Sequence, residues 1–262
     1  MHFIVCVKQV PNTANVRVDP ETNALVREGV ESILNPFDEN AIEAALQLKE
    51  AAGGTVTVLT MGPPQAADVL RHGLAMGAEA AVLLSDRAFR GSDTLATAHA
   101  LAAAVRKLAP YDLVLCGKQA IDGDTAQVGP GLAERLGLPQ VTLAAGLEIV
   151  DGKLRVRRML EDRFEVVETR LPAVVTVVKQ INEPRLPGMK GVLRARRAEI
   201  PTWTAADIEA DEAQVGFAGS PTTVVRVFTP TRRADGEMIS GDAPVAAERL
   251  AAVIRSLNLG SS

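Results

Sequence analysis

The sequence predicts an α/β fold in which helices cover both faces of a parallel sheet, with an antiparallel extension and a C-terminal arm. Two observations carry this prediction. Aliphatic runs alternate with amphipathic stretches of helical length, and the aliphatic runs are continuous, as buried parallel strands are. Aromatic residues are only 3% of the 262 residues whereas hydrophobic residues are 47%, so Val, Leu, Ile and Ala must build a substantial core.

The first half of the chain reads as a series of βα units. The expected strands are 2–7, 55–60, 80–84 and 112–116, and the expected helices are 38–52, a segment that ends near Gly73, 92–108 and 125–136. A small hairpin-like stretch, VRVDPETNALV, precedes the first helix, whose start is marked by Pro36 and the acidic Asp38. Units of this length place helices on both faces of a parallel sheet in a Rossmann-like arrangement.

Beyond Gly137 the pattern changes. Three extended segments follow one another without helices: 141–150, 153–159 and 164–169. Asp151-Gly152 is a good two-residue hairpin turn, so these segments predict an antiparallel extension. The apolar run 173–178 then predicts a strand that re-enters the main sheet, and we expect the α/β domain to span 1–181.

Two segments follow this domain. Residues 182–197, NEPRLPGMKGVLRARR, contain two prolines and two glycines among several basic residues and no apolar period, so we expect an exposed basic loop. Residues 198–262 form a tail, in which we expect a short strand at 223–228 and an amphipathic helix at 243–257. A tail of this length cannot bury a core alone, so it either wraps around a larger partner or packs on its own sheet.

Charge and composition argue against several classes of function. The formal net charge of -4 gives no overall attraction to nucleic acid, and no apolar stretch is long enough to span a bilayer. The first residues, MHFIVCVKQV, predict a strand rather than a signal peptide, so we expect a cytoplasmic protein without membrane insertion. The histidines lack metal-ligand spacing, and Cys6 and Cys116 are expected to be reduced structural thiols, so no metal site is predicted.

The loop GKQAIDGDTAQVGP, residues 117–130, is the strongest candidate for a site, because ligands of open parallel sheets bind beyond the carboxyl ends of the strands. Gly117 and Gly123 permit close approach of the backbone. Lys118 and Gln119 offer side-chain donors, and the helix that follows would present unpaired N–H groups to an anion such as phosphate. The same residues could serve only to turn the chain and cap the helix, and neither GxGxxG nor a Walker loop occurs.

Six stretches run in order through the chain: VCVKQV, NPFDENAIEAAL, GLAMGAEAAVLL, GKQAIDGDTAQVGP, LPAVVTVVKQINEPRLP and GEMISG. Together they resemble the beta (small) subunit of electron-transfer flavoproteins. The resemblance implies an adenine-nucleotide-binding domain and a heterodimer with a larger alpha subunit that carries FAD and that the C-terminal arm would contact. It assigns no catalytic side chain. It implies that the nucleotide of the beta subunit lies on the following residues: Cys6, Val7, Lys8, Asn35, Phe37, Asp38, Met61, Gly62, Gly117, Lys118, Gln119, Ala120, Ile121, Asp122, Gly123, Asp124, Thr125, Ala126, Gln127 and Val128.

The loop also bears on which nucleotide is bound. In ordinary members of the family it is AMP, and in electron-bifurcating members it is a second FAD. GDTAQVGP and VKQVP look like the bifurcating group, and Val128 removes a hydroxyl donor while leaving the helix N-terminus in place. We therefore expect FAD that accepts hydride from NADH, with electrons passing singly to ferredoxin or flavodoxin and to the alpha-subunit FAD. The alternative is an AMP-binding structural subunit of an ordinary carrier between acyl-CoA dehydrogenases and a quinone reductase.

The resemblance gives the basic loop 182–197 a role as well. In the family this loop docks partner dehydrogenases through a hydrophobic residue set among polar ones, and Leu186, Met189 and Leu193 are the candidate anchors. The loop lacks the aromatic residue that often follows NEPR, so the sequence leaves open which dehydrogenase, such as an acyl-CoA dehydrogenase, it serves. A nucleotide-binding regulatory protein without a redox role is the remaining alternative.

Overall fold

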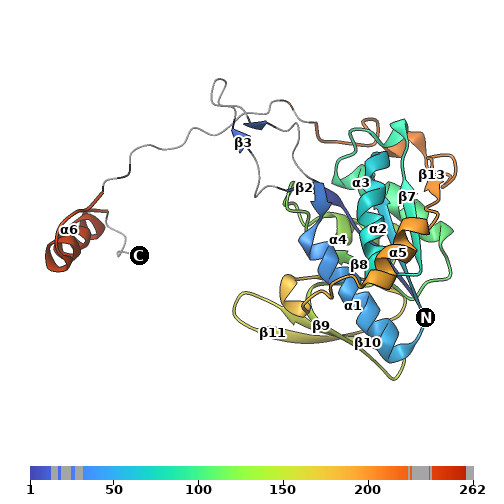
Figure 1. The fold of residues 1–262 in the computed structure, drawn as a ribbon, viewed down its shortest axis with the longest axis horizontal. Helices are drawn as coiled ribbons and strands as arrows, with labels where there is room; N and C mark the ends of the chain where they lie inside the picture. Colours follow the sequence, from blue (N-terminus) through green and yellow to red (C-terminus); the bar gives the residue numbers. More distant parts are fainter. Residues whose placement is uncertain are drawn as a thin grey trace.

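A nine-stranded sheet forms the centre of the described structure (Figure 1). The computed structural model describes residues 1–12, 17–18, 25–26, 32–223, 225, 236 and 238–257. In spatial order the strands are β11 (Phe164–Arg170), β10 (Lys153–Met159), β9 (Gln140–Val150), β12 (Ala173–Val177), β8 (Leu113–Gly117), β1 (His2–Cys6), β6 (Thr55–Met61), β7 (Ala80–Leu84) and β13 (Thr202–Trp203). Neighbours from β9 to β13 are parallel, and β9, β10 and β11 pair antiparallel. The predicted parallel sheet with an antiparallel extension is confirmed.

Smaller elements lie outside this sheet. Two short antiparallel pairs join β2 (Gln9–Pro11) with β5 (Ser32–Leu34), and β3 (Arg17–Val18) with β4 (Leu25–Val26). The second pair belongs to the hairpin that the sequence predicts, whose connecting residues lie outside the described ones. Single turns of 3-10 helix occupy Pro64–Ala66, Arg87–Phe89, Lys179–Ile181 and Glu212–Gln214.

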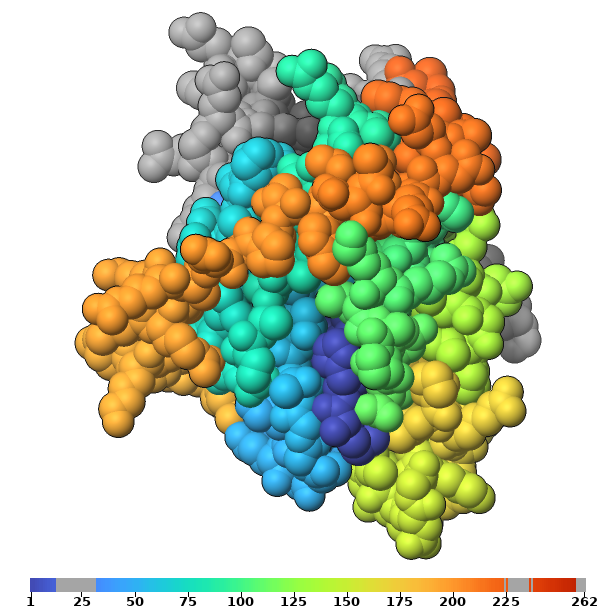
Figure 2. Space-filling view, turned by 90° about the vertical axis from the view of Figure 1, so that its right-hand side faces the viewer, coloured from blue at the N-terminus to red at the C-terminus, as the bar shows by residue number. Residues whose placement is uncertain are grey.

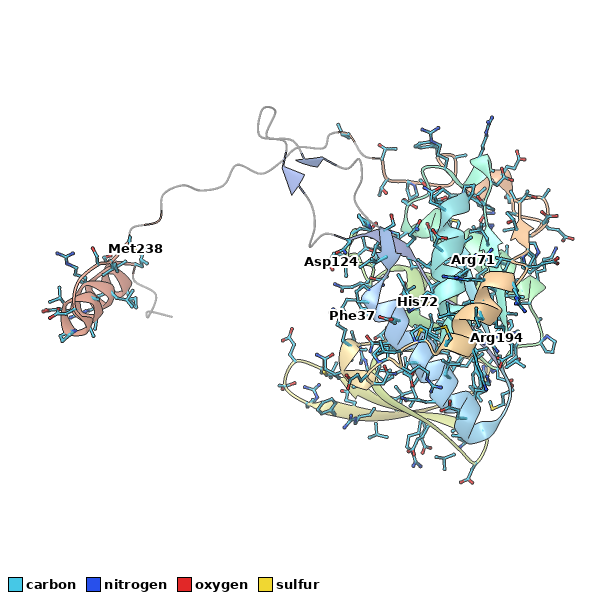
Figure 3. All side chains as sticks on the ribbon, in the orientation of Figure 1. Phe37, Arg71, His72, Asp124, Arg194 and Met238 are labelled. Carbon is cyan, nitrogen blue, oxygen red and sulfur yellow. The ribbon has the colours of Figure 1, made fainter. Side chains whose placement is uncertain are left out.

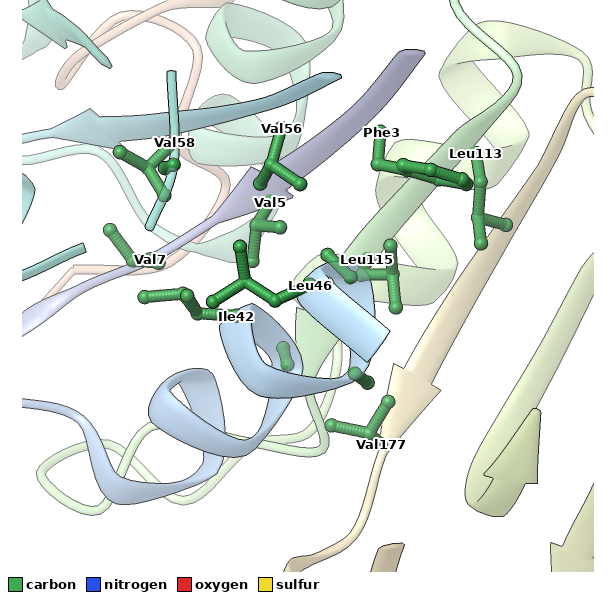
Figure 4. Packing of buried hydrophobic residues seen from close by; sticks show 14 of the residues in the cluster. Phe3, Val5, Val7, Ile42, Leu46, Val56, Val58, Leu113, Leu115 and Val177 are labelled. Atoms are coloured by element: carbon green, nitrogen blue, oxygen red, sulfur yellow. The ribbon is translucent and has the colours of Figure 1, made fainter. Parts of the chain in front are cut away.

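Helices cover both faces of the sheet. α1 (Pro36–Ala52), α2 (Ala67–Met76) and α5 (Met189–Arg197) lie on one face, and α3 (Thr94–Lys107) and α4 (Val128–Leu136) lie on the other. Successive residues of a strand serve opposite faces, so Phe3 and Val5 of β1 join the first core cluster while Ile4 and Cys6 join the second. Figure 4 shows the first cluster, where α1 packs its apolar side chains against the strands.

The direction of winding reverses between β1 and β8. From β1 the chain proceeds to β6 and β7 on one side, and then it crosses to β8 and β12 on the other. In open parallel sheets, the connections at such a switch point run to opposite faces and leave a crevice beyond the carboxyl ends of the strands. The segments that follow β1, β6 and β8 therefore meet at one edge of the sheet.

Several helix boundaries differ from those that the sequence predicts, and the start of α1 lies at Pro36 rather than at residue 38. α2 continues through Gly73 because this glycine is a packing residue, at which a Cβ would come within 3.0 Å of Val58. α3 begins at Thr94, one residue after its cap. α4 begins at Val128 rather than at residue 125, because Asp124 and Ala126 have left-handed φ angles that a helix cannot contain.

The segment predicted to be a basic loop is partly helical. Residues 182–188 are irregular, as expected, but Met189–Arg197 form α5, which packs against α2. The nine residues of this helix, MKGVLRARR, are mostly basic or small, so their polarity is typical of a loop, and a helix of this length is stabilised mainly by tertiary contacts. The prediction of a loop is therefore wrong for the second half of this segment.

The tail divides into two parts. Its first part packs on the domain itself, since β13 extends the sheet beside β7, and Ala205, Ile208 and Val215 are buried in the second core cluster. The expectation that the whole tail is an arm is wrong for this part. In α6 (Ala243–Ser256), by contrast, no residue is buried. The strand expected at 223–228 falls almost entirely outside the described residues. Among those described, no helix combines the length and hydrophobicity needed to cross a membrane.

Candidate functional site

A cavity of about 340 Å³ opens at the carboxyl ends of β1 and β8. Its volume lies in the range of small-molecule sites. One wall is the loop 117–127 together with the start of α4. The opposite wall is the first two turns of α3 with the residues just before it, and the ends of β1 and β6 and Asp38 of α1 complete the lining.

Helix α4 begins at this cavity without a side-chain cap. Its N-cap residue, Gln127, makes no capping hydrogen bond, and the first N–H groups of a helix have no partner within the helix. Val128 and Gly129, the first two residues of α4, line the cavity. An anion placed there would accept hydrogen bonds from these N–H groups and would be attracted by the positive end of the helix dipole.

The loop in front of α4 is held in a strained conformation. Asp124 and Ala126 have φ angles of 54° and 55°, which cost a non-glycine residue about 1–3 kcal/mol each. Local contacts hold this shape, since the Asp124 N–H donates to the Ala120 carbonyl and the Asp124 carboxylate accepts a hydrogen bond from the Gln119 amide. Strain that is retained at a cavity wall is typical of a preorganised binding loop.

Asn35 positions the first half of this loop through hydrogen bonds to its backbone. It is fully buried, its side-chain Nδ2 donates to the Gln119 carbonyl at 2.8 Å, and its Oδ1 accepts from the Ile121 N–H at 3.2 Å. Its own N–H donates to the Lys8 carbonyl at 2.9 Å. One residue, through its side chain and its backbone N–H, thereby joins the end of β1, the start of α1 and the loop after β8.

Asp38 lies where β1 and β8 end. Its two carboxylate oxygens accept hydrogen bonds from the N–H groups of Lys8, at 2.8 Å, and Gly117, at 3.0 Å. Burial raises the pKa of Asp38 from 3.8 to about 7, although the hydrogen bonds that the carboxylate accepts lower it. Position 117 requires glycine, because a Cβ would come within 2.4 Å of Asp38 Oδ1 and 2.6 Å of Phe37 Cβ.

Asp93 occupies the start of α3 on the opposite wall. Its Oδ1 accepts hydrogen bonds from the N–H groups of Leu95, at 2.9 Å, and Ala96, at 3.1 Å. Its Oδ2 accepts from the N–H and hydroxyl of Thr222 in the tail, at 3.2 and 2.8 Å. Partial burial raises the pKa of Asp93, but these hydrogen bonds outweigh burial and hold it below its ordinary value. The positive end of α3 is therefore already satisfied by a carboxylate.

Two exposed side-chain contacts brace the loop. Lys8 Nζ lies 2.8 Å from both carboxylate oxygens of Asp122, which ties the end of β1 to the loop. Thr94 Oγ1 of α3 donates to Gln127 Oε1 at 2.8 Å, which joins the two walls. Exposed contacts of this kind are worth at most about 1 kcal/mol each, so a ligand can displace them readily.

Cys6 and Cys116 line the cavity side by side, in register on β1 and β8. Both are free and buried. A hydrogen bond with Cys6 and burial raise the pKa of Cys116, so that thiol is protonated and unreactive at neutral pH. Within the described ranges, no group of three His, Cys, Asp or Glu side chains could hold a metal ion.

The structure brings most of the predicted site residues together around the cavity. Those that line it are Cys6, Val7, Lys8, Asp38, Met61, Gly117, Lys118, Gln119, Ala120, Gly123, Asp124, Thr125, Ala126, Gln127 and Val128. Those that do not line it are Asn35, Phe37, Gly62, Ile121 and Asp122. Of the latter, Asn35 and Asp122 hold the loop in place. Their binding of a nucleotide stays a prediction.

The cavity also includes residues that the sequence analysis missed: Ser92, Asp93, Thr94, Thr97, Leu101, Cys116 and Gly129. All but two of them come from α3 or the residues just before it. The available signal was the Ser-Asp-Thr stretch ahead of an apolar run, which is typical of a helix start, and helix starts in a parallel sheet face its carboxyl edge.

The predicted docking residues lie outside the cavity, Leu186 just before α5 and Met189 and Leu193 within it. Leu186 and Met189 are 91% and 76% exposed, and Leu193 is also exposed. In Figure 2 the yellow-orange surface of this part of the chain lies at the left, beside the teal and blue surface. The structure thus separates the candidate docking surface from the cavity.

Comparison with known proteins points to one family. Residues 22–208 match the model of the electron transfer flavoprotein domain. The chain is 53% identical to the electron transfer flavoprotein subunit beta of Megasphaera elsdenii over 90% of each chain. It is 51% identical to the caffeyl-CoA reductase-Etf complex subunit CarD of Acetobacterium woodii over 92% of each chain, and 52% identical to the protein FixA of Azorhizobium caulinodans over 90% of this chain and 86% of FixA. The chain therefore belongs to the electron transfer flavoprotein family, among its beta subunits.

Proposed function

We propose that this chain is the beta subunit of a heterodimeric, electron-bifurcating flavoprotein that works in the cytoplasm. Its cavity binds FAD, and the complex takes a hydride from NADH. One electron then passes to ferredoxin or flavodoxin and the other to the FAD of the alpha subunit. The observation that carries the proposal is the uncapped start of α4, which lines the cavity at the carboxyl ends of β1 and β8.

The lining of the cavity suits a nucleotide with phosphate groups. The N–H groups at the start of α4 favour an anion, and Lys8 and Lys118 add positive charge. Met61 and Val128 offer apolar surface to a ring system. The start of α3 is closed by Asp93, so the phosphates have one favourable place rather than two.

When bound, FAD supplies the redox chemistry, so this chain has to bind, orient and shield rather than react. Asn35 and Asp38 hold the binding loop against β1 and α1, and Gly117 lets the backbone pass close to them. Lys8 and Lys118 favour a negatively charged ligand. No side chain of this chain is assigned a catalytic step.

Two observations favour FAD over AMP. The loop sequence GDTAQVGP looks like that of the bifurcating group, and Val128 at the first position of α4 brings no hydroxyl, which is compatible with a diphosphate held by backbone N–H groups. A relative of 51% identity is a subunit of a caffeyl-CoA reductase-Etf complex, which supports a role in a complex with a reductase.

The second candidate is an AMP-binding structural subunit of an ordinary carrier, which shuttles electrons from acyl-CoA dehydrogenases to a quinone reductase. The size of the cavity favours it. About 340 Å³ lies near the lower end of the range for ligand sites, and AMP is smaller than FAD. The same helix start suits its single phosphate.

We propose that α6 contacts the alpha subunit. Leu250, Val253, Ile254 and Leu257 are all exposed, and no residue of the helix is buried. An amphipathic helix whose apolar side chains stay exposed has an unused face that another surface can cover. An alpha subunit is the partner that membership of this family implies.

We propose that Leu186, Met189 and Leu193 dock a partner dehydrogenase, such as an acyl-CoA dehydrogenase. Few apolar anchors carry most of the binding energy of a small interface, and these three are exposed in sequence order along one segment. The charged residues of α5, which carries two of them, are all basic. An acidic rim around an apolar pocket is therefore the complementary surface on the partner.

The nucleotide content of the heterodimer tests the main proposal. The chain is produced with its natural alpha subunit, acid releases the nucleotides, and chromatography that detects both FAD and AMP measures them. We expect two FAD per heterodimer. One FAD with one AMP would overturn the FAD proposal in favour of the ordinary carrier, and one FAD without AMP would contradict both candidates.

A further inference from the structure

Two neighbouring helices grip both ends of the docking segment, residues 186–193. We propose that Arg185 and Arg194 are positioning residues, which attach this segment to α1 and α2 and so fix the place at which a partner protein docks. We call these attachments the mount. The inference rests on the docking role proposed above, and it extends that role from the exposed anchors to the side chains behind them.

Arg185, just before the segment, is held by two glutamates of α1. It donates to the Glu43 carboxylate through Nε at 2.7 Å, Nη2 at 3.0 Å and its backbone N–H at 3.2 Å. Its Nη1 and Nη2 reach the Glu50 carboxylate at 2.5 and 3.1 Å. Glu43 is buried and accepts a further bond from Gln47. Forked bonds of this kind fix direction as well as distance.

A pair of asparagines, Asn40 and Asn182, adds a second set of hydrogen bonds to α1, one turn before Glu43. Asn40 Nδ2 donates to the carbonyl and the side-chain oxygen of Asn182, at 3.0 and 2.9 Å, and Asn182 Nδ2 donates back to the Asn40 carbonyl at 3.0 Å. Asn40, Glu43 and Glu50 fall on one face of α1. The first turn of the same helix holds Asp38 against the cavity loop, so one rigid element relates the cavity to the docking segment.

The far end of the segment is fastened to α2. Arg194 Nη2 donates to two carbonyls at the end of α2, at 2.8 and 3.2 Å, and Arg71 Nη1 donates to two carbonyls at the end of α5, at 2.8 and 3.3 Å (Figure 3). Each helix thus has its last carbonyls satisfied by an arginine of the other. Gly191 lets the helices approach closely, since a Cβ there would lie 2.2 Å from the Ala75 carbonyl oxygen.

These contacts have a consequence for binding. Leu186 and Met189 stay exposed while the backbone on either side of them is fixed. A free loop with the same side chains would have to be ordered on binding, and that ordering would weaken affinity. Because the mount orders the segment beforehand, its loss should weaken docking even though no anchor is changed.

The test uses the heterodimer with its alpha subunit and a substrate-reduced acyl-CoA dehydrogenase as the probe partner. In Arg185→Lys the ammonium keeps the positive charge beside Glu43 but cannot form the fork to two carboxylates. We expect KM for the dehydrogenase to rise about tenfold with kcat within about twofold. Amide hydrogen exchange in 186–192 should speed up at least about tenfold, with exchange in 117–127 and nucleotide content unchanged.

Arg155→Lys is the matched control. Arg155 also bridges two glutamates, Glu148 and Glu168, but it does so on the antiparallel extension. The Arg155→Lys variant should change neither KM for the dehydrogenase nor amide exchange in 186–192. Glu50→Gln, which weakens only the outer half of the fork, should shift both readouts in the same direction as Arg185→Lys by a smaller factor, and it covers the case in which Arg185→Lys folds poorly. If both Arg185→Lys and Glu50→Gln left KM and amide exchange unchanged, the proposal of the mount would be overturned.

The anchors provide the variant that separates the mount from the docking role. Replacing Leu186 and Met189 together by alanine should raise KM without changing exchange in the rest of the chain or nucleotide content. An unchanged KM in this double variant would overturn the docking role and the mount with it. A raised KM there, together with unchanged behaviour in Arg185→Lys, would leave the docking role standing and overturn the mount alone.

Discussion

The two helices that begin at the cavity, α3 and α4, start in opposite ways. α3 follows Asp93, whose carboxylate accepts two N–H groups of the first turn, whereas α4 follows Gln127, which caps nothing. Both starts line the same cavity. The first N–H groups of α4 have no partner within the helix and no side-chain cap, so the open start marks a place suited to an anionic ligand. The closed start directs that ligand to one wall.

The two walls are also held by different parts of the chain. The α4 wall rests on buried polar groups of the domain itself, Asn35 and Asp38. The α3 wall is fastened by the tail, because the Asp93 N–H donates to Ser220 Oγ at 2.8 Å and Thr222 binds the Asp93 carboxylate. A wall that is fixed before binding needs less ordering when the ligand arrives. The difference supports the proposal that α4 recognises the ligand and that α3 encloses it.

The largest expected effect concerns the carboxyl groups of Asp38, which supports the α4 wall, and Asp93, on the α3 wall. The pKa of Asp38 is about 7 in the folded chain against 3.8 in the unfolded chain, so the folded chain keeps a proton that the unfolded chain releases. The stability contributed by this proton is complete below pH 4 and is lost as pH rises through 7. Between pH 5 and pH 8 the loss should approach about 3 kcal/mol of unfolding free energy. Urea unfolding at both pH values measures it.

Two variants check the assignment to Asp38. Asp38→Asn should unfold with nearly the same free energy at pH 5 and pH 8. Asp93 has a lowered pKa, so its contribution has the opposite sign, being present above its ordinary pKa and lost only as pH falls through its folded value. Asp93→Asn should therefore keep the loss between pH 5 and pH 8. An undiminished loss in Asp38→Asn would contradict the assignment.

The next effect comes from giving α4 the start that α3 already has. Gln127→Asp places a carboxylate at the N-cap, where it repels phosphate and competes for the same N–H groups. Titration of the nucleotide-free heterodimer with FAD or AMP should show affinity lower by about 10- to 100-fold, or about 1.4–2.7 kcal/mol. Without nucleotide, the variant should be more stable than the unaltered chain by up to about 1 kcal/mol.

Gln127→Asn is the neutral control for this change. It has the same side-chain length as aspartate and can also cap the helix, but it carries no charge, so it keeps the competition for the N–H groups and removes the repulsion, and its affinity for the nucleotide should fall by a smaller factor than that of Gln127→Asp. Full affinity in Gln127→Asp would mean that the phosphate groups lie elsewhere, and the assignment of recognition to α4 would be wrong.

Local signals in the sequence were enough to predict the α4 wall. The apolar run before Gly117, the glycines of the loop and the change to helical period after it lie within about twenty residues, and each is a short-range pattern. The helix start was predicted three residues early, because Asp124 and Thr125 look like a cap. The left-handed angles of Asp124 and Ala126 depend on contacts within the folded loop, which periodicity does not encode.

The α3 wall and α5 depend instead on contacts between distant parts of the chain. Asp93 is fastened by Thr222, and Arg71 caps a helix that begins at Met189. In α5 the basic residues looked like a solvated loop, although Arg194 is used to cap α2. Propensity and pattern describe a segment alone, so they do not reveal a helix that forms only against its neighbour.

The smallest expected effect compares the same truncation at the two helix starts. Asp93→Ala removes two capping bonds and the hold on Thr222, and should lower the free energy of unfolding by about 1 kcal/mol or slightly more. Gln127→Ala removes only one exposed contact with Thr94, and should change it by less than about 0.5 kcal/mol. Thermal unfolding of the nucleotide-free protein resolves the two. If both truncations were equally destabilising, Gln127 would cap α4 after all, and the N–H groups assigned to phosphate would already be occupied.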